Sequence, residues 1–322
     1  MGVAMDVENK LRPKFRAQQL TIEIGGIKIG GQPGDNPTLL VGSIFYHGDK
    51  LLIDEVKGVI DKDLSKKLIE NALSIAEEYG LYFALDVIFP TPESVDKILP
   101  FVSELDVPIL FLDSPDSKAR IRAYSLSKEL GLTHRVIANG IYINTSADEI
   151  KALKENGVLN AVLLAFDPSQ PHKSMYPKDR LNIVRKLLDL AKDADVKGVL
   201  VDVVVLDPAS IGLSASTIYL VKNELGYPSG CAPANALGPV SKSNFHIEEL
   251  AGIHGGTAVF LRVMGADFIM YGPVKRIKYV APAVAMVDGL LGYLAKQEGM
   301  RIQGKHPLKT LLKKIQQLFV KT

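Results

Sequence analysis

Carboxylate and amide side chains recur at or near the ends of apolar runs along this sequence. The side chains concerned are Asp86 in ALDV, Asp113 in ILFLDS, Asn139 in VIANG, Asp167 in AFDP, Asp202 in VLVDVVV and Asn235 in APAN. Burying an unpaired carboxylate costs on the order of several kcal/mol, so these groups need hydrogen-bond donors from protein, water or a ligand. A heterocycle with several N–H donors along one edge would supply them. The 2-amino-4-oxo edge of a pterin is such a group, and a carboxylate can accept from it with both oxygens.

Some of these residues have a simpler interpretation as turn or cap residues. The pair Asp167-Pro168 is typical of the start of a turn, and Asp113 could cap a helix. Asp202 is different, because it lies inside the apolar run Val199–Leu206 and has no turn to serve. We therefore expect a functional site formed by Asp86, Asp113, Asn139, Asp202 and Asn235.

Other catalytic chemistries find no matching motif. There is no Gly-x-Ser-x-Gly elbow and no Walker loop, and no lysine lies inside the apolar runs, which argues against a Schiff-base aldolase. The histidines show no HExxH spacing. Cys231 is the only cysteine, which excludes an internal disulfide and a thiolate zinc cage. We expect no metal site, and we expect Cys231 to be structural or incidental.

Eight short apolar segments must position the candidate residues. Most are continuous runs of Val, Ile, Leu and Phe, as expected of strands buried on both faces of a parallel sheet. The segments are Thr38–Tyr46, Leu81–Ile88, Pro108–Asp113, Arg135–Ile143, Asn160–Asp167, Gly198–Leu206, Tyr227–Asn235 and Ala266–Tyr271. Helical patterns such as Asp61–Tyr79 lie between them. This spacing predicts a single (β/α)₈ TIM barrel, with a doubly wound open sheet as the competitor, and such barrels carry their active sites at the carboxyl ends of the strands.

Both ends of the chain add smaller elements to the predicted barrel. Thr21–Ile29 alternates around Gly25-Gly26, which predicts a β-hairpin covering one barrel mouth. We assign residues 1–304 to one barrel domain that includes this hairpin at 20–31, and residues 305–322 to a basic amphipathic helix. Its apolar stripe would pack on the barrel or a dimer mate, or dock a partner protein or an anionic membrane surface.

The charge distribution and the apolar stretches limit the class of protein. Of 38 cationic residues, six lie in the last 22, where no acid occurs, so residues 1–300 carry 32 cations against 36 acids. A nucleic-acid binder usually has a basic face across the fold itself, so we expect no nucleic-acid partner. The N-terminus is not a secretory signal, and the most apolar stretch, Tyr279–Ala295, contains Asp288 and is better explained as a buried helix. We expect a cytoplasmic protein.

Long stretches of the chain resemble one known family. IEIGGIKIGGQPGDNPTLLVGSIFYHGDK, KGVIDKD at 57–63, YGP at 271–273 and KYVAPAVAMVD at 278–288 look very like the H-subunit family of tetrahydromethanopterin S-methyltransferase. The resemblance covers residues 20 to 295. That family resembles the pterin-binding barrels of corrinoid-dependent methyltransferases and dihydropteroate synthases. The resemblance implies methyl transfer from a methyl-tetrahydropterin, of the tetrahydromethanopterin or tetrahydrofolate type, to the Co(I) corrinoid of a partner protein, in one-carbon metabolism or methanogenesis.

The resemblance also implies roles for the candidate residues. Asp113, Asn139 and Asp202 match positions that hold the pterin edge, with Asp86 as a further match, and Asn235 matches an asparagine that meets the methyl-bearing nitrogen. Asp113, Asp202 and Asn235 are the implied catalytic residues. The run VIANGIYIN leaves open whether Asn139 or Asn144 faces the site. The implied partners are a corrinoid protein, a second copy in a homodimer, and a membrane methyltransferase complex bound peripherally.

The departing nitrogen of such a substrate is a poor leaving group, so the site must deliver a proton or a strong hydrogen bond to it. The Asn235 amide could donate, with water linked to Asp113 or Asp202 as the proton source. Two alternatives stay open. A dihydropteroate-synthase-like enzyme would need cations for a leaving pyrophosphate, for which Lys242 and Lys275 are the candidates. The other alternative is a noncatalytic pterin-binding scaffold subunit.

Overall fold

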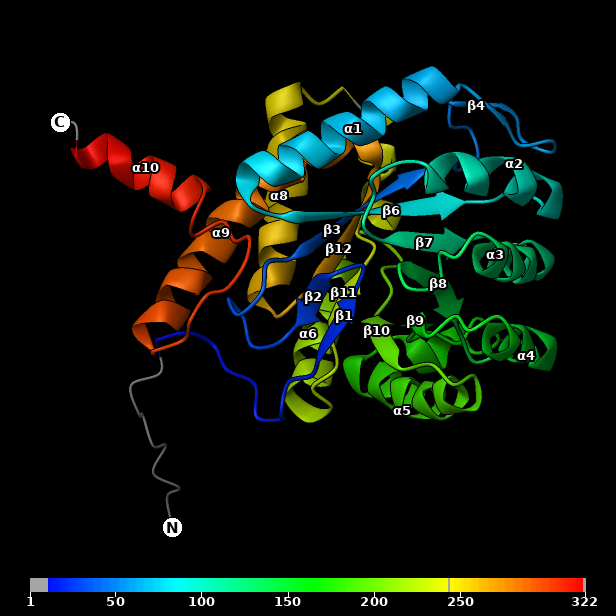
Figure 1. Cartoon of the computed structure of the whole chain (residues 1–322). Coiled ribbons are helices and arrows are strands. Elements are labelled where there is room, and N and C mark those ends of the chain that lie inside the picture. Colours follow the sequence, from blue (N-terminus) through cyan, green and yellow to red (C-terminus); the bar gives the residue numbers. More distant parts are fainter. Residues whose placement is uncertain (1–10, 243, 321–322) are drawn as a thin grey trace, which may run out of the picture.

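The protein forms a closed eight-stranded barrel surrounded by helices, as seen in a computed structural model that describes residues 11–242 and 244–320 (Figure 1). Every pair of neighbouring barrel strands is parallel, and the last strand pairs with the first. The barrel strands are β3 (Leu39–Ile44), β6 (Tyr82–Ile88), β7 (Leu110–Asp113), β8 (Val136–Ile141), β9 (Asn160–Leu164), β10 (Gly198–Asp202), β11 (Ser229–Cys231) and β12 (Phe268–Pro273). Each overlaps one of the eight predicted segments, so the (β/α)₈ prediction is confirmed.

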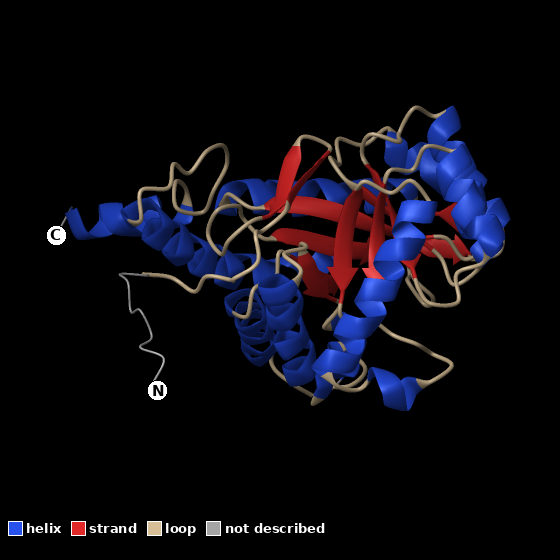
Figure 2. Ribbon diagram, turned by 90° about the horizontal axis from the view of Figure 1, so that it is seen from below, coloured by secondary structure: helices blue, strands red, loops and turns tan. Residues whose placement is uncertain are grey.

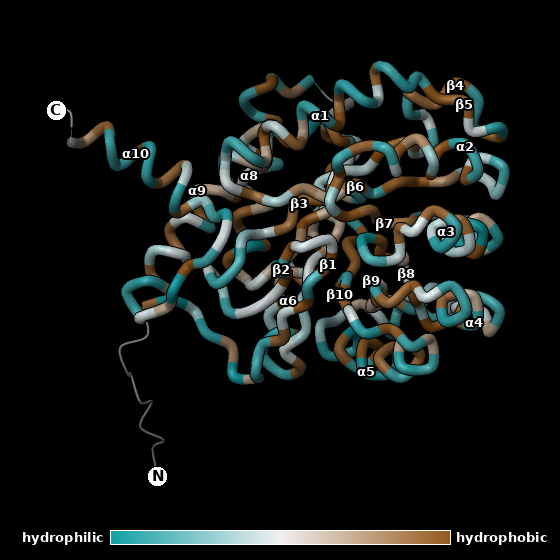
Figure 3. The backbone as a smooth tube through the Cα atoms, viewed as in Figure 1, coloured by the Kyte–Doolittle hydropathy of each residue, from teal (hydrophilic) through white to brown (hydrophobic). Residues whose placement is uncertain are grey.

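One long helix follows each barrel strand and packs outside it. These helices are α1 (Lys62–Tyr79), α2 (Pro92–Ser103), α3 (Ser117–Glu129), α4 (Ala147–Glu155), α5 (Pro177–Asp193), α6 (Ser210–Glu224), α8 (Ile247–Val263) and α9 (Ile277–Gln297). Capping residues in the sequence determine where these helices begin and end. The Ser146 hydroxyl accepts from the Glu149 N–H at the start of α4, and Gly80 takes a left-handed conformation, φ 72°, after α1. The tube in Figure 3 shows brown, apolar strands inside a layer of helices that alternate between teal and brown.

The N-terminal hairpin closes the end of the barrel where the strands begin. It consists of β1 (Thr21–Ile24) and β2 (Ile27–Gly30), which Figure 1 labels and which are joined by two glycines with positive φ. Ile24 and Ile27 are buried among the side chains that fill the barrel interior, including Phe111. The Gly25 N–H donates to the carbonyl of His134, which precedes β8. In the described part of the chain, the hairpin therefore plugs this mouth of the barrel, and the carboxyl ends of the strands form the other mouth.

The connections at the open end contain short elements. A second hairpin, β4 (Leu52–Asp54) and β5 (Val59–Ile60), lies between β3 and α1. The remaining short elements are α7 (Ala234–Leu237) after β11 and the 3₁₀ turns η1 (Pro171–Ser174), η2 (Pro239–Lys242) and η3 (Val274–Arg276). This end of the barrel is therefore built from loops, a short hairpin and single helical turns, as expected for this fold.

Helix α9 contains the predicted buried apolar stretch. Within the described residues, 274–297 is the one helical stretch long and apolar enough to cross a membrane. Half of its apolar 18-residue segment is buried in the protein. The carboxylate of Asp288 is fully buried within it. It accepts from the Arg262 guanidinium of α8 and, at 2.7 Å, from the Thr38 N–H just before β3. These contacts hold α9 against α8 and against the start of β3, as expected of a core helix.

The C-terminal helix projects from the barrel in two views (Figures 1 and 2). It is α10 (Leu311–Val320), so it begins six residues after the start that the sequence predicted. The preceding segment is fixed to α1, because Lys305 pairs with Glu77 at 2.6 Å and the Thr310 hydroxyl donates to the Tyr79 carbonyl at 2.9 Å. In α10, Leu312 is buried whereas Leu318 is 63% exposed. Burial of the apolar stripe thus decreases from Leu312 to Leu318, and residues 321–322 lie outside the described part.

Candidate active site

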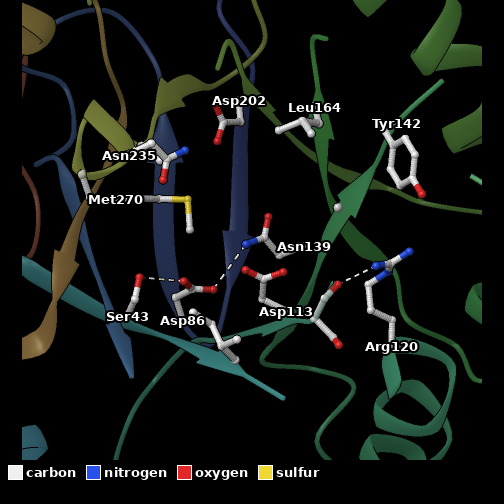
Figure 4. Close-up of a pocket in the computed structure, with 15 residues that line it drawn as sticks. Ser43, Asp86, Asp113, Arg120, Asn139, Tyr142, Leu164, Asp202, Asn235 and Met270 are labelled. Carbon is white, nitrogen blue, oxygen red and sulfur yellow. Dashed lines mark hydrogen bonds between the residues drawn. The ribbon is translucent and has the colours of Figure 1, made fainter. Parts of the chain in front are cut away.

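A cavity of about 310 Å³ opens at the carboxyl ends of the barrel strands. The structure brings all five residues of the predicted site to it, together with others that the sequence did not single out (Figure 4). The polar residues that line it are Ser43, Asp86, Asp113, Ser114, Arg120, Asn139, Tyr142, Asp202 and Asn235. Its apolar lining comes from residues such as Ile88, Leu164 and Met270. The cavity therefore combines an apolar wall with convergent acids and amides, as small-molecule sites do.

The register of the parallel strands explains this convergence. Asp113 is the last residue of β7 and is paired with Asn139 of β8. Asp202 is the last residue of β10, and Asn235 lies in α7, directly after β11. Asp86 lies two residues before the end of β6, level with Ser43 of β3. Because strands tilt around a common axis, side chains at these positions point to the same mouth of the barrel.

Asp86 is engaged with two neighbours inside the cavity. One carboxylate oxygen accepts from the Ser43 hydroxyl at 2.7 Å, and the other accepts from the Asn139 amide nitrogen at 3.3 Å. Burial raises the pKa of Asp86 to about 6, although both hydrogen bonds favour its ionised form. Since its amide nitrogen donates to Asp86, Asn139 turns its own oxygen toward the rest of the cavity, as Figure 4 shows.

Contrary to the expectation from the sequence, Asp202 does serve a turn, and this turn is strained. One of its oxygens accepts from the Val204 N–H at 2.7 Å, and burial raises the pKa of Asp202 to about 6. Val204 has φ 60°, which is costly for a β-branched residue. The fully buried Arg180 holds the strained peptides in place, because its guanidinium donates to the carbonyls of Val203 and Val204 at 2.7 and 2.9 Å. The second oxygen of Asp202 is left for a ligand or water.

Asp113 is the most perturbed of the three acids. Burial raises its pKa well above the usual range, and the nearby charge of Asp86 adds to this effect, while Arg120 opposes it. Three carboxyl groups thus share one cavity, and each has a raised pKa. Donors from a ligand would favour their ionised forms, because a hydrogen bond to a carboxylate offsets its desolvation. The cavity is suited to a ligand rich in hydrogen-bond donors.

The structure also separates the two asparagines that the sequence left as alternatives. Asn139 lines the cavity, whereas Asn144 lies in a turn after β8 and is not among the lining residues. Ser43, Arg120, Tyr142 and Met270 are lining residues that the sequence reasoning missed. Arg120 lies in α3 and carries no strand-end signal, so only the packing of α3 against the sheet reveals it. In the sequence, Ser43 could be recognised only by its position, because it occupies on the first barrel strand the place that the acids occupy on other strands.

Neither a metal site nor a reactive thiol is evident near the cavity. Within residues 11–242 and 244–320, no group of three or more His, Cys, Asp or Glu side chains is arranged to hold a metal ion. Cys231 is fully buried in β11, and burial raises its pKa, so its thiol stays protonated. His47 is exposed and contacts Glu55 in the connection between β3 and α1. The polar side chains that the described residues bring to the cavity are acids, amides, hydroxyl groups and the guanidinium of Arg120.

Comparisons with known sequences give one consistent result. A family model described as the tetrahydromethanopterin S-methyltransferase MtrH subunit matches residues 17–303. The H subunit of this methyltransferase from Methanothermobacter thermautotrophicus is 32% identical over 310 residues, covering 93% of this chain and 99% of the relative. The corresponding protein of Methanocaldococcus jannaschii is 31% identical over 323 residues, with the same coverage. The H subunit of a putative mtx methyltransferase of Methanosarcina barkeri is 29% identical over 308 residues and is covered to 99%.

Solved structures similar to this chain include dihydropteroate synthases. The enzyme of Yersinia pestis in complex with a sulfonamide drug aligns with a TM-score of 0.60 and 13% identity, covering 84% of this chain and 98% of that one. The enzyme of Thermus thermophilus in complex with 4-aminobenzoate aligns with a TM-score of 0.53 and 15% identity, covering 84% of this chain and all of the other. At such identities the similarity is one of fold, the barrel type on which these synthases are built.

Proposed function

The chain belongs to the MtrH subunit family of tetrahydromethanopterin S-methyltransferase, and we propose that it moves a methyl group from a methyl-tetrahydropterin to the Co(I) corrinoid of a partner protein. The observation that carries this proposal is the cavity in which Asp86, Asp113, Asn139, Asp202 and Asn235 converge. These residues supply acceptors on one side and an amide donor on the other. A methyl-tetrahydropterin presents the complementary edge of N–H donors and a methylated ring nitrogen.

The acids and Asn139 would hold the pterin ring. The free oxygen of Asp202 and the carboxyl group of Asp113 accept from the ring and exocyclic N–H groups, and the Asn139 oxygen adds a third acceptor. Asp86 supports this arrangement, since it fixes the Asn139 amide and is itself tied to Ser43. A hydrogen bond to a charged group is worth about 1.5–3 kcal/mol, so two such contacts would give the affinity and orientation that the reaction needs.

Asn235 would act on the departing nitrogen. As the carbon–nitrogen bond stretches, electron density builds up on that nitrogen, and a hydrogen bond from the Asn235 amide strengthens with it. A proton must follow, and it can come from solvent through water held by the carboxylate of Asp113 or Asp202. When ionised, either acid can accept a hydrogen bond from that water and orient it toward the nitrogen. In Figure 4, Asn235 lies across the cavity from Asp113.

The corrinoid supplies the Co(I) nucleophile that accepts the methyl group. A cavity of about 310 Å³ fits a bicyclic ring and not a corrin macrocycle, so the corrinoid would stay on its partner protein and approach through the open mouth. In the described part of the chain the hairpin plugs the opposite mouth, which favours this route. Since the relatives are subunits of a methyltransferase, this chain would act within an assembly. We propose that the chain forms a cytoplasmic homodimer that binds the corrinoid protein. We also propose that it associates peripherally with a membrane complex, with α10 as a contact element.

Single-turnover methylation of free cob(I)alamin tests the proposal. Purified protein is mixed anaerobically with methyltetrahydromethanopterin or methyltetrahydrofolate, and the loss of the Co(I) absorbance is followed. We expect methylcobalamin with one or both pterins, and a rate reduced by orders of magnitude in Asn235→Ala. Tight pterin binding without any methylation, with free or protein-bound corrinoid, would instead support a noncatalytic scaffold.

A dihydropteroate-synthase-like reaction is the second candidate, because the fold is shared with those enzymes. It needs cationic groups to stabilise a leaving pyrophosphate. Lys275 does not line the cavity, and the Lys242 side chain lies outside the part that the structure describes. The lining residues on the β11 and β12 side are Asn235 and the apolar Ala232, Ala234 and Met270. This arrangement favours methyl transfer, and condensation of a pterin pyrophosphate with 4-aminobenzoate is the assay that separates the two.

A further inference from the structure

One buried charge at the cavity has no part in the mechanism described so far. Among the described residues that line the cavity, Arg120 is the one cationic side chain. It is 5% exposed and projects from α3, behind the carboxyl end of β7. Figure 4 shows it on the same side as Asp113 and Tyr142, away from Asn235 and Met270. A buried guanidinium beside three acids calls for an explanation, because burying a charge is costly unless its contacts are strong.

Arg120 is held in a fixed orientation by three contacts. Its Nε and Nη2 donate to the two oxygens of Glu149, the latter at 2.8 Å, and its Nη1 donates to the Ser114 carbonyl. Glu149 is 1% exposed and also accepts from the Tyr124 hydroxyl at 3.2 Å. The guanidinium lies 6.0 Å from the ring centre of Tyr142. Such a bidentate pair fixes both position and angle, which a lysine could not do.

We propose that Arg120 is a positioning residue for the proposed methyl transfer: Glu149 fixes its orientation, and its charge favours the ionised form of Asp113 and helps to aim that carboxyl group at the pterin. Two routes connect them. The contact with the Ser114 carbonyl fixes the peptide that directly follows Asp113. The positive charge also opposes the repulsion that Asp86 and Asp202 exert on Asp113. Glu149 sets the strength of this effect, because it partly neutralises Arg120.

The groups that face Asp113 come from four elements. Asp86 of β6 and Asp202 of β10 raise its pKa, and Arg120 of α3 and the Ser114 N–H lower it. Tyr124, also of α3, is fully buried, and its pKa is raised well above the usual range, so it stays neutral. Glu149 of α4 lies behind Arg120. Arg120 is thus the one cation among these groups, and changing it should move the titration of Asp113 in a defined direction.

The test is the ¹³C NMR titration of the Asp113 carboxyl group in the ligand-free protein, identified by its loss in Asp113→Asn. Arg120→Gln removes the cation, so the midpoint should rise by about one pH unit, as expected when an opposite charge is lost. Glu149→Gln leaves Arg120 without its neutralising partner, so the midpoint should fall. Arg120→Lys keeps the charge and should stay near the wild-type midpoint.

Arg122→Gln is the matched control, because Arg122 lies on the same helix but pairs with Asp96 and Glu129 at the surface. It should leave the midpoint unchanged. Shifts of opposite sign in the two site variants support the proposal, and a merely structural role would not produce them. Equal midpoints, or shifts of the same sign, would overturn it. If Arg120→Gln does not fold, Glu149→Gln and Arg120→Lys still decide.

Pterin affinity measured against pH connects the titration to function. Wild-type affinity should rise with pH as Asp113 ionises, and in Arg120→Gln this rise should occur at higher pH. An affinity lowered equally at every pH would show that Arg120 does not act through Asp113. Absence of pterin binding by the wild-type protein would refute the proposed function, while the NMR titration would still test Arg120.

Discussion

Replacing Asp202 with asparagine should stabilise the ligand-free protein and lower its affinity for pterin. Asp202 is 4% exposed, and its pKa is raised from 3.8 to about 6 by burial. An acid with a raised pKa is easier to ionise in the unfolded chain, so its ionisation destabilises the fold as the pH rises from about 4 through about 6. A shift of this size corresponds to about 3 kcal/mol above pH 6, as an upper value. The substituted side chain keeps an oxygen that accepts from the Val204 N–H and avoids this cost.

The assay is urea unfolding of both proteins at about pH 5 and about pH 8, without ligand. The gain in free energy of unfolding of Asp202→Asn over the wild type should be about 1.4 kcal/mol larger at pH 8 than at pH 5. The rest of the gain should already be present at pH 5. Asp207→Asn, in the exposed turn after β10, is the control and should follow the wild type. Calorimetry should show pterin affinity reduced about tenfold to a few hundredfold in Asp202→Asn, because a charged acceptor is lost. Parallel stability profiles with unchanged pterin affinity would refute the reasoning.

Four further variants probe the rest of the site and the tail. Asn235→Ala should lower the single-turnover rate with cob(I)alamin more than it lowers pterin affinity; the reverse would make Asn235 a binding residue. Asp113→Asn should reduce pterin affinity in calorimetry by about tenfold or more, and wild-type affinity would move the pterin elsewhere. Cys231→Ala should retain methyl transfer within a few-fold, whereas a loss of two orders of magnitude would indicate thiol chemistry. Truncation after Leu312 keeps the buried His306 and Leu312. It should leave turnover with free cob(I)alamin intact and weaken assembly, measured by size-exclusion chromatography. Loss of turnover would place α10 in the site.

The barrel and much of its candidate site could be predicted because both depend on local signals. Buried parallel strands are continuous apolar runs, and an acid that ends such a run lies at the carboxyl edge of the sheet. Asp113 and Asp202 end their strands in this way. The segment YPSGCAPAN is a counterexample, since its own propensity for a strand is weak. β11 forms because barrel closure places it between β10 and β12, and Gly230 fits there because a Cβ would lie 2.1 Å from the Phe268 carbonyl oxygen.

The residues that the sequence did not reveal are those placed by packing between elements. Arg120 and Glu149 are 29 positions apart, on two helices whose amphipathic patterns would fit solvent-facing charges equally well. Only the contact between α3 and α4 buries both and makes them a pair. The start of α10 has a similar cause. Residues 305–310 have a helical pattern, but Pro307 disfavours helical backbone at His306, and Lys305 and Thr310 contact α1.

The cost of crowding three acids in one cavity makes sense only in the presence of a ligand. Asp86, Asp113 and Asp202 each resist ionisation, and Val204 adds backbone strain beside them. Natural proteins keep such local penalties mainly where function needs them. A pterin would offset the penalty through its N–H donors, so part of its binding free energy comes from relieving unfavourable interactions already present in the empty site.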